Sequence, residues 1–121
     1  MPELSLAGGI LRVVEDAARR ERFARVSTLT LEVGALSGVE PAALRFALQA
    51  SSPGTCLEGA EFVFQQPPGQ AWCMHCSTGV AIAQRGDACP QCGGWQLQPI
   101  AGTELRVVDL IVHDAADVPS A

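Results

Sequence analysis

The chain is short and acidic, with 121 residues, a net charge of -5 at pH 7 and 48% hydrophobic residues. This length and composition support one compact domain with a small appendage, and they exclude a chain that is disordered throughout. No apolar run reaches the roughly 18 residues of a membrane span, and the N-terminus lacks the pattern of a signal peptide, so we expect a cytoplasmic protein without a membrane partner. The cations, all arginines, are few and interleaved with acids, which argues against nucleic acid as a partner.

Hydrophobic periodicity predicts two helices and three strands outside a cysteine-rich segment. Apolar residues recur at spacings of three and four in the predicted helices, whereas they alternate or dominate in the predicted strands. Glu40 stands at the cap of the second helix, which Pro41 begins. In chain order, we expect a helix over residues 4–22, a strand over 28–33, a helix over 41–49, and strands over 61–65 and 105–112.

Two adjacent glycines, Gly8 and Gly9, lie inside the first predicted helix. Each weakens a helix by about 1 kcal/mol relative to alanine. Either packing elsewhere compensates for this cost, or another backbone approaches so closely that only a small residue fits. The sequence leaves both explanations open.

Residues 66–102 differ in composition from the rest of the chain. Breaker residues frame the segment at both ends, which is typical of an insert that leaves the main sheet and returns to it. The segment has four cysteines and few large aliphatic residues, and a unit of this size usually needs a metal or disulfides for its stability. We therefore predict an α+β fold with two parts. Residues 1–65 and 103–121 form a discontinuous α+β domain with a small sheet of about three strands and two helices, and residues 66–102 form an inserted ribbon.

Four of the five cysteines form two C-x-x-C pairs that lie twelve residues apart, namely Cys73, Cys76, Cys89 and Cys92. Each pair lets a tight turn aim two thiolates at one ion, and two such pairs complete a tetrahedral site. Because four protein ligands leave no open coordination position, we predict a structural zinc ion, with iron in a rubredoxin-like site as the alternative. His75, inside the first pair, is expected to face solvent, and Cys56 is expected to have a packing role.

Two longer runs point to a known family. The chain begins Met-Pro-Glu-Leu-Ser-Leu, and residues 31–40 read Leu-Glu-Val-Gly-Ala-Leu-Ser-Gly-Val-Glu. Together with the two cysteine pairs and the last strand, these runs resemble the HypA/HybF family, nickel metallochaperones for the maturation of nickel–iron hydrogenase and, in some organisms, urease. The resemblance covers almost the entire chain. It implies an α+β nickel domain with an inserted zinc ribbon, and it implies a HypB-type GTPase and the hydrogenase large-subunit precursor as partners.

Residue 2 departs from the family pattern. Family members begin Met-His-Glu, and the histidine is their principal nickel ligand, beside the N-terminal amine and backbone nitrogens. Pro2 supplies no imidazole, and its peptide nitrogen has no proton to lose, whereas nickel(II) favours nitrogen donors in tetragonal geometry. The resemblance assigns a weakened nickel site to Met1, Pro2, Glu3 and Glu40. Both glutamates have an alternative explanation as acidic groups at helix N-termini, and His113 is a candidate substitute ligand.

Two functions are compatible with these features. The first is a nickel-delivery protein, monomeric or homodimeric, with structural zinc and a weakened site for transient nickel. The second is a regulatory relative that docks to the GTPase or to the hydrogenase precursor without delivering metal. A nucleic-acid-binding ribbon is disfavoured because Arg85 and Asp87 are the only charges between residues 66 and 102. An enzyme is not expected, because the sequence offers no nucleophile–base pair and no phosphate-binding loop.

Overall fold

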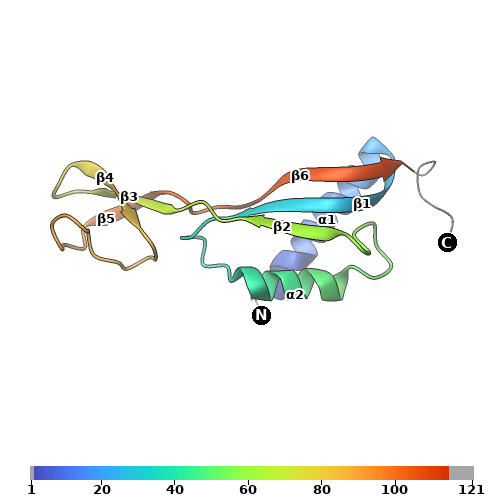
Figure 1. Ribbon diagram of the computed structural model, residues 1–121, viewed down its shortest axis with the longest axis horizontal. Coiled ribbons are helices and arrows are strands. Elements are labelled where there is room, and N and C mark those ends of the chain that lie inside the picture. Colours follow the sequence, from blue (N-terminus) through green and yellow to red (C-terminus); the bar gives the residue numbers. More distant parts are fainter. Residues whose placement is uncertain (1, 115–121) are drawn as a thin grey trace. The chain divides into compact units, whose positions relative to one another are not determined.

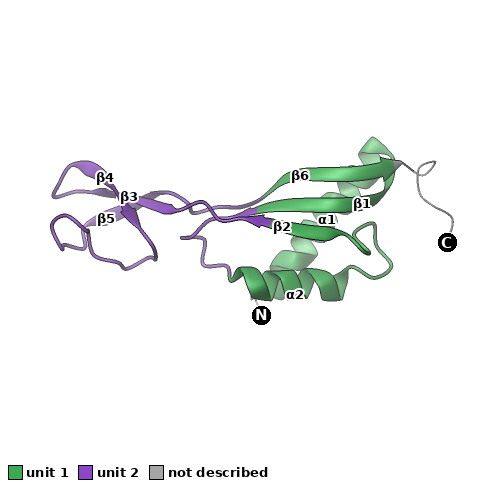
Figure 2. Ribbon diagram, in the orientation of Figure 1, with its two compact units in different colours: residues 1–31, 40–63, 107–121 green, residues 32–39, 64–106 purple. Residues whose placement is uncertain are grey.

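The computed structural model describes residues 2–114, with the side chains of residues 3–113, and the chain divides into two compact units (Figure 1 and Figure 2). Unit 1 comprises residues 1–31, 40–63 and 107–121, and unit 2 comprises residues 32–39 and 64–106. Neither helix of the described range combines the length and hydropathy that a membrane crossing requires.

Two helices and six strands make up the described range. They are α1 (Pro2–Glu21), β1 (Phe23–Val33), α2 (Pro41–Ser51), β2 (Glu61–Gln65), β3 (Gly69–Cys73), β4 (Thr78–Ile82), β5 (Leu97–Ala101) and β6 (Leu105–Asp114). The strands form two three-stranded sheets, with the orders β2-β1-β6 and β4-β3-β5. All five elements predicted from periodicity are present, and the α+β fold class is confirmed.

The core of unit 1 combines both helices with the central strand β1. Helix α1 packs against α2. The largest fully buried side chains of this unit are Val14, Val26, Leu29, Leu31, Leu44, Leu48 and Leu57. Each such side chain stabilises the fold by roughly 1.5–3 kcal/mol relative to an exposed one. Unit 1 therefore has an apolar core of its own that requires no metal.

Strand β1 begins at Phe23, well before the predicted start at residue 28. Arg22 has a φ of 60° and turns the chain directly from α1 into β1. Phe23, Val26 and Leu29 are buried at spacings of three, and the spacing becomes two only beyond Leu29. A search for strict alternation therefore recognises only the second half of this strand.

Gly8 and Gly9 lie on the exposed side of α1, where an added Cβ would meet nothing within 4 Å. The explanation that another backbone approaches them is therefore wrong. Ala7 and Ile10 beside them are buried, so packing of these flanking residues compensates for the low helix propensity of the two glycines.

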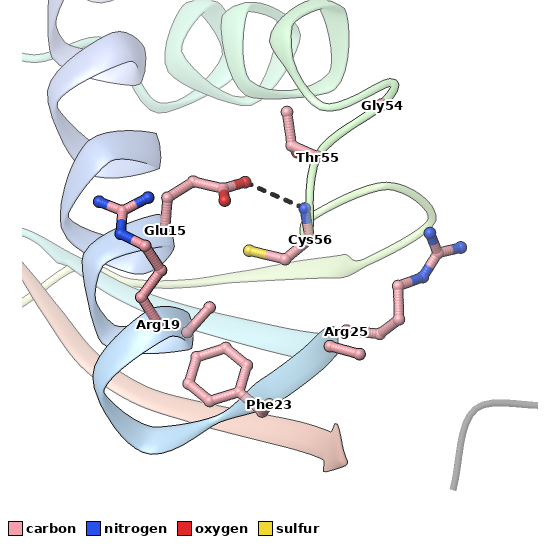
Figure 3. Close-up of a pocket in the computed structure, with 9 residues that line it drawn as sticks. Glu15, Arg19, Phe23, Arg25, Gly54, Thr55 and Cys56 are labelled. Atoms are coloured by element: carbon pink, nitrogen blue, oxygen red, sulfur yellow. Dashed lines mark hydrogen bonds between the residues drawn. The ribbon is translucent and has the colours of Figure 1, made fainter. Parts of the chain in front are cut away.

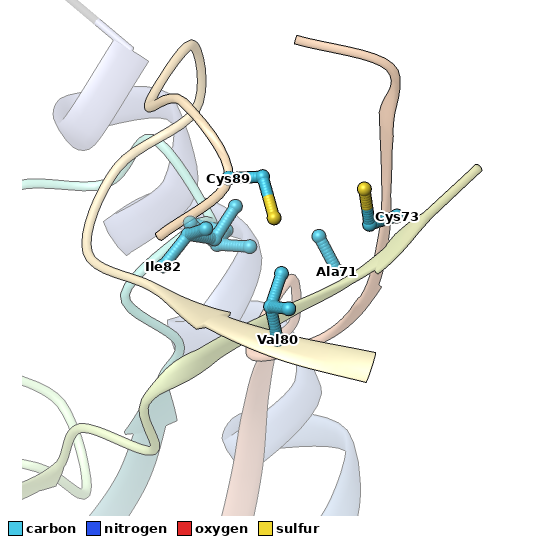
Figure 4. Close-up of a cluster of buried hydrophobic side chains, with 6 residues drawn as sticks. Ala71, Cys73, Val80, Ile82 and Cys89 are labelled. Carbon is cyan, nitrogen blue, oxygen red and sulfur yellow. The ribbon is translucent and has the colours of Figure 1, made fainter. Parts of the chain in front are cut away.

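Unit 2 is built around β3, which pairs antiparallel with β4 on one side and with β5 on the other. Its buried core consists of Leu36, Ala71, Cys73, Val80, Ile82 and Cys89 (Figure 4). Leu36 comes from residues 32–39, which lie far from the other core residues in the sequence. Unit 2 is therefore larger than the insert of residues 66–102 that composition alone suggests.

Two backbone segments of unit 2 pass each other where only glycine fits. An added Cβ on Gly34 would collide with the carbonyl group of Gly102, and one on Gly102 would collide with the carbonyl group of Pro68. The N–H of Leu36 donates to the Gly102 carbonyl at 2.7 Å. This close approach holds the segment that carries Leu36 against the strands of unit 2.

Alanine is expected to have opposite effects at Gly34 and at Gly8. Gly34→Ala drives a methyl group into neighbouring backbone, which costs about 1–3 kcal/mol of stability. Gly8→Ala adds helix propensity in open space and stabilises α1 by about 0.5–1 kcal/mol. Denaturant unfolding of both variants beside the wild type measures the difference. Equal free energies of unfolding for the two variants would contradict the close backbone approach at Gly34.

Candidate metal centre

The two cysteine pairs form turns of the same geometry. The carbonyl of Cys73 accepts the N–H of Ser77 at 2.8 Å, and the carbonyl of Cys89 accepts the N–H of Gly93 at 2.8 Å. The residue that closes each turn has a positive φ, 52° at Ser77 and 74° at Gly93. Each turn thereby points both of its sulfur atoms to the same side.

The four sulfur atoms lie together as one cluster. All of them are within 4.8 Å of one another, with 3.7 Å between the Sγ atoms of Cys73 and Cys92 and 4.0 Å between those of Cys76 and Cys89. Four thiolates at about 2.3 Å from a tetrahedral ion would have sulfurs about 3.8 Å apart, whereas a disulfide requires about 2.0 Å. The spacing therefore fits a four-thiolate metal site and excludes disulfides among these cysteines.

The surroundings of the sulfurs favour thiolates at some positions and oppose them at others. Backbone N–H groups of Cys92 and Gln91 lower the pKa of the Cys89 thiol to about 7. For Cys76, burial and then hydrogen bonds with the other three thiols raise the pKa to about 12. Four thiolates cannot share this small volume without a compensating positive charge, and a divalent cation supplies that charge.

The cluster is part of the core of unit 2. Cys73 and Cys89 are buried, Cys76 is half-buried and Cys92 is the most exposed. With four protein ligands the site has no position for a substrate or water, so its geometry supports folding and not catalysis. His75 is exposed, as predicted.

The residues predicted for nickel do not form a comparable cluster. Among the described residues, only the four cysteines form a group of three or more metal-ligating side chains within reach of one ion. Met1 lies outside the described residues, and Pro2 is the first residue of α1, where a missing N–H costs nothing. Glu3 is half-buried in the first turn of α1.

Glu40 caps a helix, and His113 is exposed on a strand. The Oε1 atom of Glu40 accepts the N–H of Ala42 at 3.4 Å, so this carboxylate caps α2 as predicted. His113 is exposed on β6. Neither residue belongs to a cluster of potential metal ligands in the described range.

The fifth cysteine lines a separate pocket of about 460 Å³ in unit 1 (Figure 3). Cys56 is buried, and its N–H donates to the carboxylate of Glu15 at 3.1 Å. Burial, and then the negative charge of Glu15, raise the pKa of the Cys56 thiol to about 11. This thiol is therefore a packed, protonated group at neutral pH, in agreement with the role predicted for it.

Cys56 is expected to react slowly with iodoacetamide. A pKa of about 11 in place of 9.0 lowers the thiolate fraction at pH 8 by about 100-fold, and the higher nucleophilicity of a more basic thiolate leaves a rate about tenfold below that of an ordinary thiol. Glu15→Gln removes the negative charge and should raise the rate. Mass spectrometry of the alkylated peptide measures both rates, and equal rates in the wild type and in Glu15→Gln would contradict this account.

The same pKa predicts loss of stability in alkali. Because the folded thiol stays protonated while the unfolded one ionises above pH 9.0, the unfolded chain gains stability between pH 9.0 and about 11. The contribution of Cys56 is therefore fully present below pH 9.0 and is lost as the pH approaches about 11. Cys56→Ala should remove this part of the alkaline transition, which denaturant unfolding at pH 8, 9 and 10 would measure.

One contributor to the site was missed in the sequence. Leu36 packs into the cysteine core, and Nε of Arg85 donates to the Leu36 carbonyl at 2.7 Å. The sequence predicts no helix or strand between residues 33 and 41, because no local period marks a single apolar residue whose partners lie far along the chain. The only available signal was the apolar Leu36 between two glycines.

Comparisons with known proteins agree with this arrangement. A sequence model of a family described as HypA, hydrogenase/urease nickel incorporation metallochaperone, matches residues 1–112. The hydrogenase maturation factor HypA of Cupriavidus necator is 64% identical over 114 residues, 94% of this chain and 96% of that protein. The corresponding factor of Polaromonas naphthalenivorans is 63% identical over 94% of this chain and 99% of that protein.

The fold has a counterpart among solved structures. The solution structure of the nickel metallochaperone HypA from Helicobacter pylori matches with a TM-score of 0.66 at 16% identity, over 93% of this chain and 97% of that one. This likeness concerns the fold, whereas the family follows from the sequence matches. The chain belongs to the HypA family of hydrogenase/urease nickel-incorporation metallochaperones.

Proposed function

We propose that this chain delivers nickel during hydrogenase maturation, that its four-cysteine cluster holds a structural zinc ion, and that Pro2 weakens its N-terminal nickel site. The family membership supports the delivery role. The observation that carries the zinc assignment is the four-sulfur cluster, with spacings of 3.7 and 4.0 Å across two pairs. A delivery protein binds and releases an ion, so it needs no catalytic groups.

Zinc fits the surroundings of the cluster better than an electron-transfer iron. The residues that pack around the sulfurs are aliphatic, namely Leu36, Ala71, Val80, Ile82 and Leu97. Both tryptophans of the segment, Trp72 and Trp95, are exposed. The site thus lacks an aromatic shell, and its position in the core of a small unit supports a role in holding that unit together.

The proposed nickel site consists of the N-terminal residues with Glu3 and Glu40. Without an imidazole at residue 2, and without a peptide N–H that could be deprotonated there, the remaining donors are mostly oxygens. Nickel(II) binds such a set weakly and with little selectivity over other divalent ions. The engagement of Glu40 as the cap of α2 supports this assessment.

The proposed partners are a HypB-type GTPase and the hydrogenase large-subunit precursor, with urease as a second client. Both delivery and docking without delivery require such partners. The regulatory alternative gains no support from the described residues beyond the weakness of the nickel ligands, so delivery remains the preferred function.

Complementation tests the proposed function. A hydrogenase-positive host that lacks its own HypA gene receives the wild type, Cys89→Ala or an empty vector, and hydrogenase activity is measured at limiting and at excess nickel. We expect the wild type to restore activity at a lower nickel concentration than Cys89→Ala or the empty vector requires, even with a weakened nickel site. If the wild type fails to restore activity although it accumulates to the level of the host protein, the delivery function is wrong.

A further inference from the structure

The four cysteines of the metal centre differ in their exposure to solvent. Cys73 and Cys89 are buried and Cys76 is half-buried, whereas Cys92 is exposed. Both residues next to Cys92 in the sequence are exposed as well, so the turn that carries it lies at the surface of unit 2. A small oxidant in solution therefore reaches the sulfur of Cys92 before it reaches the other three.

The exposure of Cys92 has a chemical consequence because a metal-bound cysteine is a thiolate. A thiol that coordinates a cation loses its proton, and the oxidation of cysteine by peroxide follows thiolate character and exposure. Four thiolates around one divalent cation also leave an excess of negative charge, which keeps the sulfurs electron-rich. Cys56 lacks both properties, because its thiol is buried and outside the cluster.

A second thiolate lies within reach of Cys92. The Sγ atom of Cys73 is 3.7 Å from that of Cys92. Cys73 ends the central strand β3 and is paired on both sides, with Thr78 of β4 and with Leu97 of β5. Cys92 lies in a turn and is followed by two glycines, so its backbone is free to follow the sulfur. The approach of the two sulfurs to the distance of about 2.0 Å in a disulfide therefore moves the turn and leaves the strand in place.

We propose, on the basis of the zinc assignment in the proposed function, that Cys92 is a peroxide-sensitive site whose oxidation forms a disulfide with Cys73 and releases the zinc ion. The thiolate of Cys92 attacks one oxygen of hydrogen peroxide, the O–O bond breaks, and a sulfenic acid and a hydroxide ion form. The thiolate of Cys73 then attacks the sulfenic sulfur, the S–O bond breaks, and a second hydroxide ion leaves. Two electrons thus pass from the two sulfurs to one molecule of peroxide.

The disulfide removes two of the four zinc ligands. Cys76 and Cys89 alone do not complete a tetrahedral site, so the ion passes to solvent or to a chelator. Because the cysteines are part of the core of unit 2, this unit loosens, whereas unit 1 keeps its own apolar core. A thiol reductant and zinc reverse the change, since a disulfide is a reversible product. The site thereby couples the folding of unit 2 to the concentration of peroxide.

Treatment of the zinc-loaded full chain with one equivalent of hydrogen peroxide tests the proposal. A chelating dye follows the released zinc, and N-ethylmaleimide then labels the remaining thiols in denaturant. We expect the loss of one zinc ion per chain, together with a decrease of about 2 Da in the mass of the unlabelled chain. Cys56 should be labelled to the same extent with and without peroxide.

Tryptic digestion identifies the disulfide. The chain has arginines and no lysine, so the two C-x-x-C pairs fall into different peptides, residues 46–85 and 86–106. A disulfide within either pair leaves these peptides separate, whereas a disulfide between Cys73 and Cys92 joins them. Fragmentation of the joined peptides shows which cysteines are linked, and we expect Cys73 and Cys92.

Two variants that keep four zinc ligands show which sulfur reacts. Histidine is an ordinary ligand in sites with three cysteines, so Cys92→His and Cys76→His both replace one thiolate without opening the site. Cys92→His should still retain its zinc when the wild type has released half. Cys76→His is the matched control and should release zinc with the Cys73–Cys92 disulfide, because it keeps both reacting sulfurs. Metal analysis before peroxide establishes that each variant is loaded.

Several outcomes overturn the proposal. Zinc release without joined peptides does so, as does a link through Cys76 or Cys89, or equal release from the two histidine variants. If neither variant binds zinc, the linkage found in the wild type decides alone. A wild type that holds zinc and keeps it in peroxide overturns only the peroxide-sensitive site. A wild type that binds no zinc overturns the zinc assignment of the proposed function as well.

Discussion

Cys89→Ala is expected to release the metal and unfold unit 2 while unit 1 stays folded. A structural zinc ion contributes about 10–16 kcal/mol of apparent binding free energy, whereas the apolar core of unit 2 consists of six buried residues, two of which are cysteines of the site. Without the thiolate of Cys89, the metal no longer links β3 to the turn of residues 89–93. Unit 1 keeps its own buried leucines, including Leu29 and Leu44.

Metal content by mass spectrometry and amide NMR spectra measure this effect. The indole signals of Trp72 and Trp95 should collapse to their random-coil positions in Cys89→Ala, while the signals of unit 1 stay dispersed. Cys56→Ala is the matched control, because Cys56 belongs to unit 1 and is not a member of the four-cysteine cluster, so the substitution should leave the metal in place. If Cys89→Ala still binds one metal tightly and has a dispersed spectrum, three thiolates are enough to hold the metal and to keep unit 2 folded.

Pro2→His is expected to bind nickel at least about tenfold more tightly than the wild type, since even the loss of a group that only supports a metal ligand costs about 10–100-fold in affinity. The substitution supplies an imidazole and also restores a peptide N–H that can be deprotonated, and nickel(II) prefers both kinds of nitrogen donor to carboxylate. The increase should occur without a change in the fold, because the first residue of a helix needs no special side chain.

A nickel titration of zinc-loaded protein measures the two affinities, with the N-terminal residue and the zinc content determined by mass spectrometry. Pro2→Ala is the informative control, since it restores the N–H without an imidazole and thereby separates the two contributions. If the wild type binds nickel as tightly as Pro2→His, the ligands must lie elsewhere. Glu3, Glu40 and His113 would then be substituted next.

Local residue patterns were enough to predict most elements and the cysteine cluster. The two C-x-x-C pairs specify their own turns, because each pair needs only a short stretch of chain to orient its sulfurs. The cap of α2 at Glu40 and the boundaries of β2 are equally local and were predicted correctly. The first half of β1 was missed, because its buried residues Phe23 and Val26 do not alternate.

Which segments form unit 2, and which side chains lie on its outer face, could be determined only from the tertiary structure. Leu36 joins the cysteine core, and Gly34 passes the carbonyl of Gly102, through contacts between segments more than 30 residues apart. Trp72 could be assigned to the exposed side only when the pairing of β3 with its neighbours was known.

By itself, the sequence determined the four-cysteine motif and the family, and it predicts weak nickel ligands, because these features depend on which atoms a few neighbouring residues carry. Only the tertiary structure showed which distant segments pack around the cysteines and which side chains are exposed. Packing depends on long-range contacts, and no pattern of neighbouring residues encodes such contacts.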